Sequence, residues 1–74
     1  MTLNCRGQLC PQPVIELAKA VRTASTGSVI RIETDDPAAA VDIPAWCRMR
    51  GHSVVVVEQS DGALVHDVTV GRVA

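Results

Sequence analysis

The order of strand-like and helical segments is the feature that most constrains how this chain folds. Strand patterns are found at residues 3–5, 28–34, 53–59 and 63–70, with one helical segment after each of the first two. Right-handed crossovers place both helices on the same face of the sheet. The sequence therefore predicts a single domain over residues 1–74, an α/β fold of order β-α-β-α-β-β. The predicted architecture is a two-layer α/β sandwich, with a four-stranded mixed sheet and two helices on one face.

The first helix is predicted from apolar residues that recur three and four positions apart. Its inner face is expected to consist of Val14, Leu17, Ala18 and Val21. Glu16, Lys19 and Arg22 are expected on the solvent side. The turn-forming residues 26–28 end the helix, and Ile30 and Ile32 of the next strand are predicted to face the core.

The second helix is predicted to start at Asp35-Asp36-Pro37, where a capping carboxylate precedes a proline. Because Pro44 lacks an amide hydrogen and clashes with the preceding turn, an unbroken helix through it is not expected. Residues 37–41 should form the first turns, and a second start at 42–44 should carry Trp46 and Cys47 inward. Gly51 is the predicted stop.

Four consecutive valines, residues 54–57, dominate the third strand. Their number predicts that both faces of this strand are at least partly covered. Asp61-Gly62 is a hairpin signal, so the fourth strand should return antiparallel to the third.

Composition limits the function. The net charge is -1 and Trp46 is the only Phe, Tyr or Trp, which argues against direct nucleic-acid binding. The longest apolar stretch is far short of a membrane span, and the start of the chain does not resemble a secretory signal. The expected location is cytoplasmic, where the three cysteines stay reduced.

Cys10 is the candidate nucleophile. In Cys10-Pro11-Gln12-Pro13 both prolines fit the first turn of a helix, where an amide has no intrahelical partner. A thiol that caps this turn lies at the positive end of the helix dipole, which favours the reactive thiolate, and Arg6 could add to the effect. The alternative is that Cys10 only caps the helix. His52 and His66 have no motif that ties them to Cys10, which argues against a protease-like cysteine–histidine pair.

The other cysteines are predicted to be structural. Cys5 is expected on a core strand, although a disulfide with Cys10 is a functional alternative. Cys47 is expected to be buried and inert beside Trp46. The spacing of the cysteines does not fit a zinc site, and no metal or cofactor is expected. Arg48 and Arg50 form either a solvated helix end or part of a docking surface.

The Cys10-Pro11-Gln12-Pro13 motif resembles the Cys-Pro-x-Pro signature of the TusA/SirA-like sulfur-carrier proteins. The resemblance continues through Asp35-Asp36-Pro37, Asp42-Ile43-Pro44 and Trp46-Cys47, in the same order along the chain. The family often has aspartate at the position of Asn4 and glutamate at that of Gln12. Both departures remove negative charge near the thiol and could change which partner is recognised.

The resemblance implies a sulfur-relay carrier without independent turnover. Cys10 would accept sulfane sulfur as a persulfide from a cysteine desulfurase or a rhodanese-type donor. It would pass the sulfur to a downstream acceptor protein, in tRNA thiolation, molybdenum-cofactor assembly or dissimilatory sulfur oxidation. No direct nucleic-acid or membrane contact is implied. The competing hypothesis is a thiol redox module that uses a Cys5–Cys10 disulfide.

Overall fold

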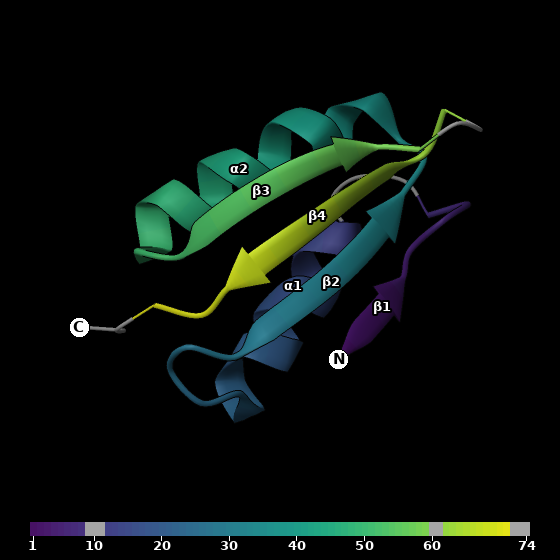
Figure 1. The fold of residues 1–74 in the computed structure, drawn as a ribbon. Coiled ribbons are helices and arrows are strands. Elements are labelled where there is room, and N and C mark those ends of the chain that lie inside the picture. Colours follow the sequence, from purple (N-terminus) through teal and green to yellow (C-terminus); the bar gives the residue numbers. More distant parts are fainter. Residues whose placement is uncertain (9–11, 60–61, 72–74) are drawn as a thin grey trace.

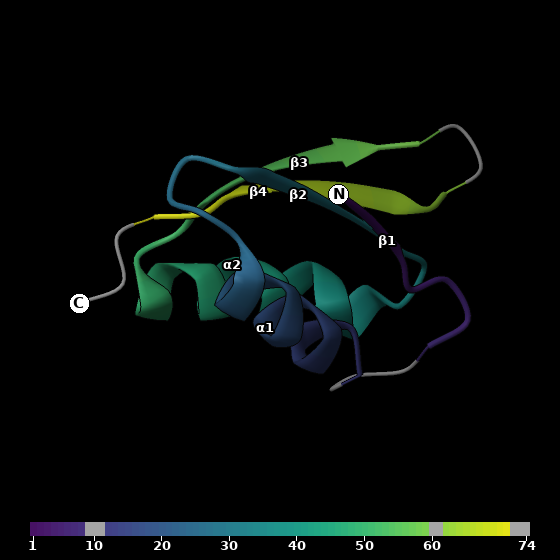
Figure 2. The same ribbon diagram turned by 90° about the horizontal axis from the view of Figure 1, so that it is seen from below.

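The four strands form one mixed sheet in the order β1-β2-β4-β3. The computed structural model describes residues 1–8, 12–59 and 62–71. Strand β1 (Thr2–Asn4) pairs parallel with β2 (Val29–Thr34). Strand β4 (Leu64–Thr69) lies antiparallel between β2 and β3 (Ser53–Glu58). Figures 1 and 2 show that helices α1 (Gln12–Thr23) and α2 (Pro37–Arg50) both cover one face of this sheet. The predicted two-layer sandwich is confirmed.

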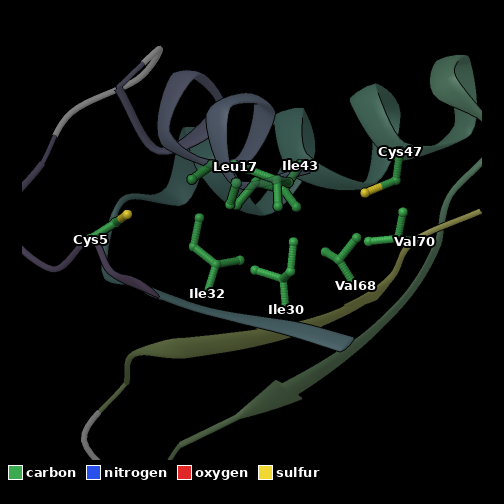
Figure 3. Packing of buried hydrophobic residues seen from close by; sticks show 10 residues of the cluster. Cys5, Leu17, Ile30, Ile32, Ile43, Cys47, Val68 and Val70 are labelled. Atoms are coloured by element: carbon green, nitrogen blue, oxygen red, sulfur yellow. The ribbon is translucent and has the colours of Figure 1, made fainter. Parts of the chain in front are cut away.

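The core lies between the helices and the two central strands. Ile30 and Ile32 of β2 and Val68 of β4 point toward Leu17 of α1 and Ile43 of α2 (Figure 3). All five are at most 1% exposed. The predicted inward direction of the two isoleucines is confirmed. It follows from strand alternation, which sends Arg31 and Glu33 to the opposite, uncovered face.

Helix α1 buries a slightly different stripe from the predicted one. Its buried residues are Pro13, Leu17 and Ala20. Val14, Ala18 and Val21 are half-buried. Helix α1 packs against both α2 and β2, so its buried residues are set by two neighbouring elements.

The prediction that Pro44 interrupts the second helix is wrong. Helix α2 runs unbroken from Pro37 to Arg50 with Pro44 inside it. An internal proline costs about 3 kcal/mol in helix propensity. Ala39, Ile43 and Cys47 recur every four residues on the buried face of α2. Burial of this continuous stripe, which is possible only if the helix continues, offsets the cost of the proline.

Both predicted ends of α2 are confirmed. The carboxylate of Asp36 accepts a hydrogen bond from the Ala38 backbone N–H at 3.0 Å, and Pro37 follows as the first helical residue. Gly51 ends the helix in the left-handed region with φ 79°. This conformation suits glycine because it has no Cβ.

The prediction that both faces of the third strand are covered is wrong. Strand β3 lies at the edge of the sheet, and Val55, Val56 and Val57 are 63%, 45% and 47% exposed. Only Val54 is half-buried. Neither helix covers the outer face of the sheet, and an edge position leaves one side of the strand open. The hairpin signal at Asp61 lies outside the described residues, but β3 and β4 are antiparallel as predicted.

Candidate functional site

The predicted nucleophile belongs to the connection between β1 and α1. Because β1 and β2 are parallel, the connections that follow them lie at the same end of the sheet. Cys10 itself, with Leu9 and Pro11, lies outside the described residues. Its role as helix cap therefore remains a prediction. The described residues on either side fix where the connection leaves the sheet and where it enters the helix.

A short turn leads from β1 toward Cys10 and is held by backbone hydrogen bonds. The Cys5 N–H donates to the Glu33 carbonyl at 2.8 Å, which extends the pairing of β1 with β2. The Gln8 N–H donates back to the Cys5 carbonyl at 3.2 Å. Gly7 has φ 79°, a conformation that favours glycine.

Asp35 ties the two connections together. Its Oδ1 accepts a hydrogen bond from the Gly7 backbone N–H at 3.0 Å. Sequence reasoning assigned both Asp35 and Asp36 to capping of the second helix, but only Asp36 performs that role. The one signal in the sequence for the Asp35 contact was the predicted parallel pairing of the first two strands. This pairing brings residues 28 positions apart to the same end of the sheet.

Arg6 contacts a carboxylate at this end of the sheet. Its Nη2 lies 3.4 Å from Glu33 Oε1, and its backbone N–H donates to Asn4 Oδ1 at 3.2 Å. The effect of Arg6 on Cys10 remains a prediction. The Glu33 carboxylate offsets part of the charge that sequence reasoning expected to act on the thiol.

The described start of α1 is anchored in the core. Pro13 is buried, and the Gln12 amide donates to Glu16 Oε1 at 2.8 Å. The first described turn carries no acidic side chain. Glu16, one turn further on, places its carboxylate against this start through the bond to Gln12 and so offsets part of the positive end of the α1 dipole.

A small cavity with acidic walls lies at the same end. Its volume is about 330 Å³, and it lies between the start of α2 and the turn from β3 to β4. The carboxylates that line it belong to Asp35, Asp36 and Glu58. A partner that docks here meets negative charge.

Cys5 and Cys47 are core residues, as predicted. They are 2% and 0% exposed and lie toward opposite ends of the core (Figure 3). Burial raises the pKa of the Cys47 thiol to about 11. Burial also raises the pKa of Cys5, with a smaller contribution from Glu16. Both thiols are therefore poor nucleophiles at neutral pH.

Both histidines are buried. His52 Nδ1 accepts a hydrogen bond from the Gly71 N–H at 2.9 Å, and its ring centroid lies 5.3 Å from that of Trp46. His66 is fully buried in the middle of β4, and burial lowers its pKa. Among the described residues, no group of three or more His, Cys, Asp or Glu could hold a metal ion.

The comparisons with known proteins agree with this architecture. Residues 1–70 match the family described as "Sulfurtransferase TusA". A protein of Archaeoglobus fulgidus, named "Putative sulfur carrier protein", is 31% identical over 61 residues, which are 82% of this chain and 84% of that protein. The crystal structure of a SirA-like protein from Desulfitobacterium hafniense has the same fold. Its TM-score is 0.86 at 24% identity, covering 96% of this chain and 97% of that one.

These matches define the class of protein as a small sulfur carrier. The chain belongs to the TusA family. A carrier of this kind exchanges sulfur with donor and acceptor proteins. Neither helix in the described part of the chain is long and apolar enough to cross a membrane.

Proposed function

We propose that Cys10 carries sulfane sulfur as a persulfide and passes it to an acceptor protein. The observation that carries this proposal is the burial of the other two cysteines, whose thiols have raised pKa values. A sulfur carrier needs a thiolate that a partner can reach. By elimination, and by its position in the Cys-Pro-x-Pro motif, Cys10 is that residue.

The transfer is a pair of thiol exchange steps with no net oxidation. The Cys10 thiolate attacks the outer sulfur of a donor persulfide, a new S–S bond forms, and the donor leaves as a thiolate. In the second step an acceptor thiolate attacks the outer sulfur on Cys10, and Cys10 leaves as a thiolate. The α1 dipole supports both steps, because Cys10 is a thiolate when it attacks and when it leaves.

The donors that fit this chemistry are a cysteine desulfurase or a rhodanese-type protein, each of which forms a cysteine persulfide. The carrier acts in the cytoplasm. Its sulfur is used for tRNA thiolation, molybdenum-cofactor assembly or dissimilatory sulfur oxidation. The tether between Gly7 and Asp35 supports transfer between proteins. It holds the turn before Cys10 in one position against the sheet, so a partner meets a defined surface.

The test is intact-mass spectrometry after incubation with a cysteine desulfurase and cysteine, and separately with a rhodanese and thiosulfate. The expected result is a gain of one sulfur atom that is retained in Cys5→Ser and Cys47→Ser and lost in Cys10→Ser. A gain that survives Cys10→Ser would contradict the proposal. A loss of two hydrogens that requires both Cys5 and Cys10 would instead indicate the redox module.

A further inference from the structure

A second cavity lies at the end of the molecule away from the Cys10 connection. It has a volume of about 550 Å³ and lies where α1 and α2 end. Helix α1 starts next to the Cys10 connection and ends at this cavity. Its 12 residues separate the two places by about 18 Å. The cavity is therefore distinct from the proposed sulfur-carrying site.

Two arginines give the cavity a positive wall. Arg22 comes from the last turn of α1, and Arg50 is the last residue of α2. Neither guanidinium forms an ion pair or hydrogen bond with another residue in the described part of the chain. Among residues 1–8, 12–59 and 62–71, none of those that line the cavity is acidic. Two guanidiniums beside one cavity without a carboxylate favour an anionic ligand.

His52 adds a polar group to the same wall. It lines the cavity and is 8% exposed. Because Nδ1 accepts the hydrogen bond from the Gly71 N–H, the proton of the neutral ring lies on Nε2. Among the described residues Nε2 has no hydrogen-bond partner. The Nε2–H group is therefore available to donate a hydrogen bond to a ligand.

The rest of the wall is largely apolar and includes a flat surface. Trp46 packs against His52 with the two ring planes 31° apart, and both rings line the cavity. Val21 and Val70 line it as well. An inorganic ion would leave this apolar wall in water. A ligand with an apolar body would cover the wall and bury that surface.

We propose that this cavity binds a small organic anion, a carboxylate on a flat apolar body. The carboxylate faces Arg22 and Arg50, and the apolar body lies against Trp46 and the two valines. A competing explanation is that both arginines only stabilise helix C-termini. Ligand binding separates the two explanations, because helix stabilisation does not depend on an added anion.

Trp46 is the only tryptophan, so its fluorescence and its indole N–H signal in an NMR spectrum report on this cavity directly. The probe is benzoate, titrated into the full chain, with neutral benzamide as the matched control ligand. The expected result is a saturable change with benzoate that is at least about tenfold weaker with benzamide. Inorganic phosphate should bind more weakly than benzoate, because it cannot cover the apolar wall.

Arg22→Gln and Arg50→Gln should each weaken benzoate binding by about five- to tenfold. The matched control is Arg48→Gln, which removes an exposed arginine of α2 that does not line the cavity. Circular dichroism checks that each variant is folded. The absence of a saturable change, or equal weakening in Arg48→Gln, would overturn the proposal. Equal affinity for phosphate and benzoate would overturn the assignment of an organic ligand.

Discussion

The two ends of this molecule carry charges of opposite sign around their cavities. Where β1 and β2 end, the charged groups that line the cavity are the carboxylates of Asp35, Asp36 and Glu58. Where the helices end, they are the guanidiniums of Arg22 and Arg50. Helix α1 separates the ends by about 18 Å, well beyond the roughly 8 Å screening length at physiological ionic strength. The charges at one end therefore have little electrostatic influence on the other end.

The two ends also differ in the hydrogen bonds that fix their backbone. At the first end, the turn after β1 is fixed by hydrogen bonds from Cys5, Gly7 and Gln8, which include the tether to Asp35. At the other end, the backbone closes α2 through the His52 N–H, which donates to the Cys47 carbonyl at 2.8 Å. Each end thus keeps its backbone fixed while leaving different side chains for binding.

The largest expected effect is a difference in alkylation rate between Cys10 and the two buried cysteines. Native protein treated with iodoacetamide at pH 8 should be alkylated at Cys10 well before Cys5 or Cys47. With a pKa of about 11, only about one Cys47 thiol in a thousand is ionised at that pH, and burial blocks it further. Peptide mass mapping over time measures the three rates. Comparable rates at Cys10 and Cys47 would break the distinction between core thiols and the proposed carrier thiol.

Acid should lower the free energy of unfolding through His66, which lies in the interior between the two ends. Burial lowers the pKa of His66, so the unfolded chain binds a proton more readily than the folded chain. Stability is therefore fully present above the unfolded value of about 6.5 and falls as the pH drops below it. The fall approaches about 1.4 kcal/mol per pH unit. Urea unfolding at several pH values measures it, and His66→Leu should remove this part of the pH dependence.

Removal of the α2 cap should destabilise the whole protein by about 1 kcal/mol. In Asp36→Ala the Ala38 N–H loses its acceptor at the start of the helix. Thermal unfolding measures the loss, and Asp36→Ser is the control that keeps a capping oxygen. An equal loss in both variants would show that the cap hydrogen bond is not the source of the effect.

The smallest effect is expected from Asp35→Ala, which cuts the tether to Gly7 at the Cys10 end. The loss in unfolding free energy should be about 0.5–1 kcal/mol. Amide hydrogen exchange should become faster at Gly7 and stay unchanged at Gly71, at the opposite end. Asp35→Asn keeps an acceptor oxygen and should preserve the protection. Faster exchange at both amides would indicate global loosening instead.

Local patterns in the sequence predicted most of the fold. Helix caps such as Asp36 and Gly51 are short-range signals, and alternation assigned Ile30 and Ile32 to the core. The two errors depend on tertiary structure. Pro44 is tolerated because the helix buries residues on both sides of it, and the valines of β3 are exposed because the strand lies at an edge. Neither burial nor edge position can be derived from periodicity alone.

The candidate site was predictable only in part. The burial of Cys5 was predicted from its place on a core strand, and that of Cys47 from its place beside Trp46 on the inner side of the second helix. The contact between Gly7 and Asp35 depends on strand pairing, and the cavity at Arg22 and Arg50 depends on two helix ends that meet in space. The structural part of the Cys10 prediction lies outside the described residues. Cys10 is therefore assigned by its motif and by the burial of the other two cysteines.

The open edge of β3 has a consequence for how the protein behaves at high concentration. Its outer backbone donors and acceptors lie beside three exposed valines, and residues 53–58 include no lysine or proline. Natural proteins use such residues to keep the edge strands of different molecules from pairing. Aggregation of the folded state should therefore begin at this strand. Val56→Lys, which places a charge in the middle of the edge, should raise the concentration at which the protein precipitates.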